Sequence, residues 1–501
     1  MARMLDTIER VGNMVPHPAV IFVGLIVLAI LLSHVLYLMG TSVTYEMFNP
    51  ETHALEQTTA TAQSLLTADG IRFLFADVVQ NFMSFNAVGV IIVAMLGVGV
   101  AEEAGLISAL IRKLVTVAPA KALTYILVFV GILSSVAADA GYLVLIPLAA
   151  SAFVSVGRHP LTGLAASFAG VAAVFSVNIL VKPLDGMLTE ITNDAIHLID
   201  PSTSIGLASN LWFSIASVVV LTLVVSLITD KIIEPRLGTY KGAEAHKAGG
   251  ELSADESRGL RYAGLALLGT LALFALLAIP SGAPLRNPET GALIGDSPFM
   301  NGLIVFVTLL FLATGLAYGI GAKTIKGTTD VTSAMEKAVA GLGGLIFLLF
   351  IISQFLAVFS YSNMATLAAV KVGDLLESLG LPGLVLLVGF VFVVAVLDLI
   401  MTGAIPKWAI FAPVFVPLLM RLGIEPEAVL AAYRVGDSPM NSISPLNAYF
   451  ALIVTFAAKY QKDAGIGTVV ALMMPYVIAL MIVWPLLLAG WHLLGLPWGL
   501  G

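Results

Sequence analysis

The sequence contains no cysteine, which excludes disulfide bonds and thiolate metal ligands. Charged residues are scarce as well: they make up 11% of the 501 residues, whereas soluble globular proteins contain about 25%. Hydrophobic residues make up 59% of the chain. No basic tract suggests binding to nucleic acid, and the net charge of −7 is spread along the sequence. This composition predicts an integral membrane protein surrounded by the lipid bilayer.

Two further features are missing. The stretch GIGAKT at 319–324 lacks the spacing of a phosphate-binding loop, which excludes a nucleotide-driven pump. The first apolar run, 19–40, is too long for a signal-peptide core and lacks a cleavage site. We therefore interpret this run as the first membrane helix.

A helix needs about 20 apolar residues to cross a bilayer. Nine segments approach this length: 17–40, 86–101, 161–180, 207–229, 262–280, 301–320, 339–362, 428–458 and 467–489. The segment 86–101 is short, and residues 71–85 are a candidate extension of it.

Two other apolar stretches, 122–156 and 384–421, are too long for one span, and each has a polar or Gly/Pro break in its middle. Such a stretch is either two crossings or a hairpin that enters and leaves on the same side. If the amino terminus is cytoplasmic and both stretches are hairpins, most lysines and arginines fall in the cytoplasm, as the positive-inside rule requires. Lys182 then falls outside, whereas Lys407 and Arg434 stay at membrane depth. The prediction is an all-α protein with nine transmembrane helices and two oppositely oriented re-entrant hairpins.

The chain also contains an internal repeat. A shift of 266 residues aligns 145–170 with 411–436 without a gap, and it brings Gly157 onto Gly423 and Pro160 onto Pro426. The two copies have opposite orientations in the predicted topology. Inverted repeats are typical of secondary transporters, which bind substrate near the midplane at interrupted helices. We expect a first half at 1–235 with hairpin 122–156, a cytoplasmic linker at 236–261 and a second half at 262–501 with hairpin 384–421.

The stretch RVGDSPMNSISPLNAYF at 434–450 predicts a discontinuous helix. Its two prolines, Pro439 and Pro445, each remove a backbone donor, so we expect a break at about 436–445. Freed carbonyls are tolerated at membrane depth where they line protein or a water-filled cavity, and there they can coordinate a cation. Candidate ligands beside them are Asp437, Asn441 and Ser442. The matching break in the first half is GVAAVFSVN at 170–178, with Ser176 and Asn178.

The two hairpin tips supply the other side of the expected site. They carry Ser134, Ser135 and Asp139 in the first half, and Asp398, Thr402 and Lys407 in the second. Several of these residues also have structural interpretations. Asp437 could pair with Arg434 three residues earlier, Asp398 could be a buried neutral acid or a partner of Lys407, and Asp139 could cap the second arm of its hairpin.

At these residues the chain resembles the p-aminobenzoyl-glutamate transporter (AbgT) family. The motifs are VAEEAGL (100–106), SSVAADAGYLVLIPLAA (134–150), GRHPLTGLAASFAGV (157–171), KIIEPRLG (231–238), KWAIFAPVFVP (407–417) and RVGDSPMNSISPL (434–446). The resemblance implies a homodimer with a cytoplasm-facing basin, and ion-driven transport of folate catabolites or export of sulfonamide-like antimetabolites. By motif position it places the functional residues at Asp185, Trp408, Pro426, Arg434, Asp437 and Pro445, with Trp408 as a candidate aromatic wall.

The chain departs from the family pattern at three places. It has Asp398 before Leu399 where the family usually has an Asn-Leu pair, Ile405-Pro406 before Lys407-Trp408 where the family has Ser-Ala, and GVAAVFSVN in place of a glycine-rich motif. These departures leave the substrate and the coupling ion open.

The sequence therefore predicts an ion-coupled secondary transporter of a small organic anion, not an enzyme, in the inner membrane of a bacterium. We expect no cofactor other than the coupling ion, which is a proton or a sodium ion held by Asp398, Asp437 and Asn441. The alternatives are a dicarboxylate or other organic-anion carrier, a channel, and, more remotely, an intramembrane aspartyl protease that uses Asp398 and Asp437. The protease motif Gly-x-Gly-Asp is incomplete here, because Arg434 takes the place of its first glycine.

Overall fold

The computed structural model describes residues 18–49, 54–116, 118–136, 141–240, 252–294, 297–378, 380, 382–399, 403–447 and 449–500. The predicted site residues Asp139 and Thr402 lie outside these ranges. Within them the regular secondary structure is helical except for one antiparallel strand pair, β1 (Ser42–Asn49) and β2 (Ala54–Thr61), in which Ser42 faces Thr61. The all-α prediction did not include this pair of strands, because both strands lie outside the long apolar runs.

Eight helices in the described ranges are long and apolar enough to cross a membrane. They are α2 (Pro18–Leu38), α5 (Asn86–Glu103), α11 (Leu211–Ile228), which continues to Leu237 through η4 (Thr229–Ile233) and α12 (Glu234–Leu237), α13 (Ala254–Ala278), α15 (Leu303–Ala322), α17 (Gly343–Tyr361), α20 (Ala404–Arg421) and α23 (Ile466–Leu493). Many outward side chains on them are apolar, such as Leu265 and Leu268 on α13. Such a surface is stable against lipid, which confirms a multi-span membrane protein.

Two of the predicted spans are interrupted. Residues 161–180 fall on α9 (Pro160–Phe168) and the π-helical turn η3 (Ala169–Ala173), after which 174–182 form no helix until α10 (Pro183–Ile196) begins. Residues 428–458 divide into α21 (Pro426–Met440) and α22 (Phe450–Ala458).

The breaks thus lie at 174–182 and 441–449, a few residues later than predicted at 170–178 and 436–445. Pro439 removes only its own hydrogen bond to the preceding turn, so α21 continues past it to Met440. In the first half, a wide π turn extends the helical backbone to Ala173.

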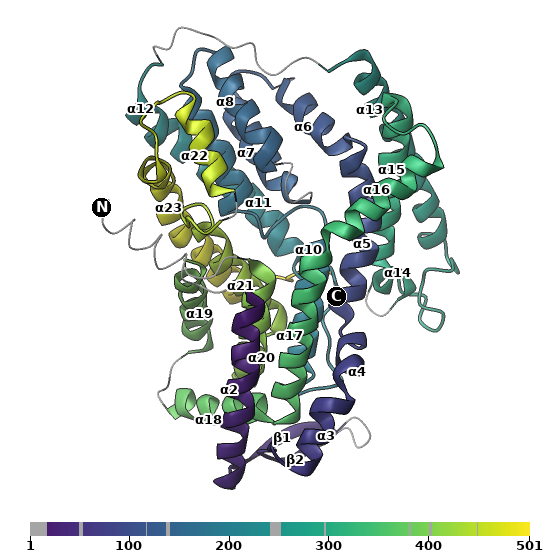
Figure 1. Cartoon of the computed structure of the whole chain (residues 1–501), viewed down its shortest axis with the longest axis vertical. Helices are drawn as coiled ribbons and strands as arrows, with labels where there is room; N and C mark the ends of the chain where they lie inside the picture. The colour runs from purple at the N-terminus through teal and green to yellow at the C-terminus, as the bar shows by residue number, and fades with distance from the viewer. Residues whose placement is uncertain are drawn as a thin grey trace.

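Each long apolar stretch forms two helices. The first contains α7 (Leu123–Leu133), η1 (Ser134–Val136), η2 (Gly141–Leu145) and α8 (Ile146–Ser155), and the second contains α19 (Gly383–Asp398) and α20. Figure 1 shows α7 and α8 in the upper part of the molecule and α19 below them, with α10 and α21 between the two levels.

One backbone turn is the same in both copies of the sequence repeat. The amide of Arg158 donates to the Phe153 carbonyl at 2.8 Å, and the amide of Ile424 donates to the Leu419 carbonyl at 3.0 Å, which is the same bond shifted by 266 residues. The glycine between the two helices is left-handed in both copies, with φ of 75° at Gly157 and 78° at Gly423. The next helix then starts with a proline at its first position in both copies.

Other helices complete the fold: α3 (Ala68–Ala76), α4 (Val78–Met83), α6 (Leu106–Thr116), α14 (Pro298–Asn301), α16 (Thr328–Gly341) and α18 (Met364–Ser378). Two predicted boundaries need correction. Residues 71–85 do not extend α5 but form the separate short helices α3 and α4. Helix α13 begins inside the predicted linker 236–261, because Ser253 and Glu256 form a capping box at its start.

Candidate functional site

A cavity of about 750 Å³ lies where both hairpins and both helix breaks meet. Ser135 and Val136 from the first hairpin and Gly403 and Ala404 from the second line it, although they are far apart in sequence. The breaks contribute Phe175, Asn441, Asn447 and Tyr449, α10 contributes Pro183, Leu184 and Met187, and α5, α16 and α17 supply further lining residues. Small-molecule sites typically measure about 300–1,000 Å³.

Aromatic and charged side chains occupy different parts of the cavity wall. Tyr142 and Tyr449 stack with ring centroids 4.3 Å apart and an interplanar angle of 13°, one ring from each half of the chain. On another part of the wall, Lys337 on α16 pairs with Glu103 at the end of α5, at 3.2 Å. Both of these charged side chains are exposed. The cavity therefore has a stacked aromatic surface and a solvated charged edge.

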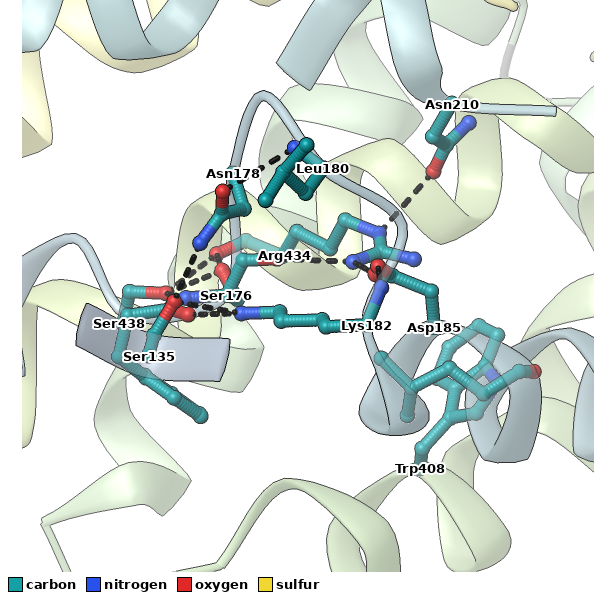
Figure 2. A network of polar contacts seen from close by, with 12 residues as sticks. Ser135, Ser176, Asn178, Leu180, Lys182, Asp185, Asn210, Trp408, Arg434 and Ser438 are labelled. Atoms are coloured by element: carbon teal, nitrogen blue, oxygen red, sulfur yellow. Dashed lines mark hydrogen bonds and ion pairs between the residues drawn. The ribbon is translucent and has the colours of Figure 1, made fainter. Parts of the chain in front are cut away.

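The first helix break contacts the last turns of α21, just before the second break begins. Ser176 in the first break donates from its hydroxyl to the backbone carbonyl of Arg434 at 2.9 Å, and it also hydrogen-bonds the hydroxyl of Ser438. Arg434 in turn donates to the carbonyl of Ser176 at 2.8 Å. Figure 2 shows this interlock between segments of the two halves.

Arg434 is the center of the interlock and is only 2% exposed. Its guanidinium pairs with Asp185 at 2.6 Å and donates to the side-chain oxygen of Asn210 at 3.2 Å. Asp185 lies in the first turn of α10, where it also accepts a bond from the backbone amide of Lys182 at 2.8 Å. The partner of Arg434 is therefore Asp185 and not Asp437, so the alternative pairing of Arg434 with Asp437 is wrong.

The second hairpin meets α21 through three buried charges. Lys407 on α20 forms ion pairs with Asp398, at the end of α19, and with Asp437 on α21, the latter at 2.6 Å. All three side chains are at most 1% exposed. Tyr433 donates to the same oxygen of Asp437 at 3.1 Å. We call Asp398, Lys407 and Asp437 the acidic triad. With both carboxylates ionised, it carries one negative charge in excess.

Each carboxylate of the acidic triad keeps one buried oxygen, Oδ2, without a hydrogen-bond partner among the described residues. Buried polar atoms are rarely left unsatisfied, so these oxygens suit a proton or a small cation. The third expected ligand, Asn441, lines the cavity, and its amide nitrogen donates to the backbone carbonyl of Asp437 at 2.9 Å. No group of three or more His, Asp or Glu side chains gathers as a metal site in the described ranges.

Of the expected residues in the described ranges, only Asn441 and Ser135 line the cavity, and the positions of three others differ from the expectation. Trp408 is fully buried behind the cavity, where its indole donates to Thr192 of α10 at 2.9 Å and its ring packs on Tyr433 at 4.5 Å. The expected aromatic wall is therefore formed by Tyr142, Phe175 and Tyr449 instead. Pro426 starts α21 at the opposite end from Asp437, and Pro445 lies in the second break without reaching the cavity wall.

Two further residues lie in the breaks as expected. Ser442 is buried and donates to the carbonyl of Pro439 at 2.8 Å. Asn178 is 2% exposed and its amide donates to Ser135 at 3.0 Å, as well as to the carbonyls of Ile132 and Leu133. Asn178 thus fixes the first hairpin tip against the first break.

Lys182 was not among the residues expected at the site. The charge count assigned it to the exterior, but the side chain is 1% exposed and lies in the polar network of Figure 2. Its ammonium donates to the Phe175 carbonyl and to the Ser135 hydroxyl, the latter at 3.2 Å. In the sequence, Pro183 followed by Asp185 is typical of the first turn of a helix. This pattern places Lys182 directly before the first residue of that helix.

Comparison with known proteins agrees with this architecture. A family model of AbgT transporters matches residues 3–501. The p-aminobenzoyl-glutamate transport protein of Escherichia coli is 35% identical over 499 residues, which cover 100% of this chain and 96% of that protein. The YdaH transporter of Alcanivorax borkumensis has a TM-score of 0.90 and 43% identity, over 97% of this chain and 100% of that one. MtrF of Neisseria gonorrhoeae, from a class of antimetabolite efflux pumps, has a TM-score of 0.90 and 40% identity, over 97% of both chains.

The matches cover nearly the whole chain, from the first helices to the last. These relatives are transporters, and no catalytic family is indicated. The chain belongs to the AbgT transporter family.

Proposed function

We propose that this protein is an ion-coupled secondary transporter of a small organic anion that carries an aromatic amide, such as p-aminobenzoyl-glutamate. The observation that carries the proposal is the cavity between the two hairpins and the two helix breaks, with the acidic triad buried beside it. Secondary transporters bind substrate and coupling ion at this kind of junction between repeats.

The stacked pair Tyr142 and Tyr449 is the proposed surface for the aromatic ring of the substrate. Offset stacking on such rings contributes about 0.5–1.5 kcal/mol beyond the buried area. Asn441 and Asn447 are near the same wall and offer amide groups to a polar substrate. Lys337, at the exposed edge, is a candidate partner for a substrate carboxylate, in exchange for its pair with Glu103.

The acidic triad is the proposed coupling site. Lys407 neutralises one of the two carboxylates, and the remaining negative charge would be balanced by one proton or one sodium ion at the free Oδ2 atoms. Because Lys407 and Asp398 belong to the hairpin and Asp437 to α21, binding of a cation there would change how tightly the hairpin is held against the helix. That change is the proposed link between ion binding and access to the cavity.

The proposed topology has nine spans and two re-entrant hairpins in a bacterial inner membrane, with the amino terminus in the cytoplasm. The equal backbone turns at Gly157 and Gly423 support the repeat, and the distribution of lysine and arginine along the chain supports its inversion. We further propose a homodimer, which rests on family membership; chemical cross-linking in membranes, followed by denaturing electrophoresis, tests it.

The direct test of the substrate is binding and transport by the purified protein in liposomes. Labelled p-aminobenzoyl-glutamate should enter saturably, and excess unlabelled substrate on the other side should drive counterflow. A sulfonamide and a simple aliphatic dicarboxylate serve as competitors. Competition by the dicarboxylate alone would replace the proposed substrate class with the dicarboxylate alternative, and transport that never saturates would indicate a channel.

A further inference from the structure

Lys182 is a buried cation without an acidic partner of its own. It lies at the end of the first break, and its ammonium donates to the backbone carbonyl of Phe175 in the same break and to the hydroxyl of Ser135 at the first hairpin tip. The ring of Phe175 lies 5.6 Å from the nitrogen. No carboxylate forms an ion pair with this ammonium among the described residues, because the nearby Asp185 is paired with Arg434.

The oxygens around this ammonium are of the kind that coordinates a monovalent cation. In discontinuous membrane helices, unwound backbone carbonyls commonly serve as ligands for a coupling ion. A lysine ammonium carries the same single charge and offers three donors to such oxygens. These oxygens therefore suit a cation, and the side chain of Lys182 provides that cation (Figure 2).

An alternative role for Lys182 would be to bind a carboxylate of the substrate. The geometry argues against it: Lys182 is 1% exposed and does not line the cavity, whereas Ser135 does. The ammonium thus lies behind the cavity wall, with the hydroxyl of Ser135 between it and the substrate space.

The second half has a lysine at the corresponding junction. Lys407 connects the second hairpin to the second discontinuous helix through Asp398 and Asp437, just as Lys182 connects the first break to the first hairpin through Ser135. The two junctions differ in charge. The second has two carboxylates around its lysine and a net negative charge, whereas the first has neutral oxygens and a net positive charge.

We propose that the ammonium of Lys182 is a tethered cation, which takes the place of a sodium ion between the first hairpin tip and the first helix break. This inference rests on the proposed function as a carrier and specifies its coupling: the first half binds no exchangeable ion, and only the acidic triad of the second half does. Removal of the lysine side chain should create a sodium site, since the carbonyl and hydroxyl ligands would remain with room for an ion.

The experiment measures sodium binding rather than transport, so its result does not depend on the substrate. Full-length protein in detergent is melted in sodium, potassium and choline chloride at equal ionic strength. The variants are Lys182→Ser, which opens the site, and Lys182→Met, which removes the charge but fills the space. Lys113→Ser, at an exposed position on α6, is the matched control.

We expect Lys182→Ser to gain a sodium-specific rise in melting temperature of about 2 °C or more over the wild type, saturable with sodium. Lys182→Met and Lys113→Ser should gain none. A folded Lys182→Ser protein with the sodium response of the wild type would overturn the proposal.

A second measurement leaves Lys182 intact, in case Lys182→Ser does not fold. Asp437→Asn removes the excess charge of the acidic triad, so this variant should show no sodium-specific stabilisation at all. A sodium response that persists in Asp437→Asn would show an exchangeable ion elsewhere and would contradict the assignment of Lys182. If the proposed substrate is wrong but Lys182 is a tethered cation, these melting results still hold.

Discussion

Replacement of Lys407 by methionine should destabilise the protein far more than replacement of either of its acidic partners. Lys407→Met keeps a side chain of similar length but leaves Asp398 and Asp437 buried together without a cation. At 2.6 Å and an effective dielectric constant of about 20, the attraction between Lys407 and Asp437 is about 6 kcal/mol, and desolvation offsets part of it. Removal of one member of such a buried pair typically costs about 3–5 kcal/mol.

Asp398→Asn is the matched control, because it leaves one lysine facing one carboxylate. An amide of the same shape still accepts a bond from Lys407, and the excess charge disappears, so we expect a change of less than about 1 kcal/mol. In the triple variant Lys407→Met, Asp398→Asn, Asp437→Asn, most of the stability lost in Lys407→Met should return, since no unpaired charge remains.

The assay is thermal unfolding of purified protein in detergent, followed by intrinsic tryptophan fluorescence and by loss of monodisperse protein. The predicted order of melting temperature is wild type close to Asp398→Asn, then the triple variant, then Lys407→Met. Equal melting of Lys407→Met and wild type would refute the reasoning, because it would mean that the two carboxylates do not depend on Lys407 for charge compensation.

Three other predictions concern the interlock, the cavity and the topology. Arg434→Lys should lose most transport while remaining inserted, because a lysine cannot contact Ser176, Asp185 and Asn210 together; transport near the wild-type rate would remove the guanidinium from the mechanism. Tyr142→Leu should raise KM for an aromatic substrate roughly 2- to 10-fold, whereas Tyr142→Phe should not, as measured by initial uptake rates; an equal effect of both would exclude ring stacking. Since the chain has no cysteine, single cysteines can be labelled without background: Ser155→Cys should react only from the cytoplasm and Glu425→Cys only from outside, and reaction of both from one side would refute the inverted repeat.

Much of the architecture could be predicted because each signal is local in the sequence. The lengths of the apolar runs predicted the long helices, and matching Gly and Pro positions predicted the repeat. The structure has the same turn at Gly157 and at Gly423. The breaks were displaced by a few residues because one proline interrupts one hydrogen bond, and the neighbouring carbonyls decide where the helix ends.

The partners within the site could not be predicted, because they come from segments that meet only in three dimensions. Arg434 has a carboxylate three residues away at Asp437, yet it pairs with Asp185, some 250 positions earlier in the chain. Lys182 was not predicted as a site residue for a related reason: a positive charge beside an apolar span indicates topology, whereas its contacts with Ser135 and Phe175 form only in the fold. For Asp398, the alternative in which it pairs with Lys407 agrees with the structure, in which Lys407 has Asp437 as a second partner.

The most direct test of ion-coupled transport is accumulation of labelled p-aminobenzoyl-glutamate in liposomes under an imposed ion gradient. A proton gradient and a sodium gradient are applied separately, to wild type and to Asp437→Asn. We predict that wild type concentrates the substrate above equilibrium under one of the two gradients. The accumulated substrate should be lost when an ionophore collapses that gradient. Asp437→Asn should still exchange substrate but should not concentrate it. The account is contradicted if wild type only equilibrates the substrate under both gradients, or if Asp437→Asn concentrates it as well as wild type does.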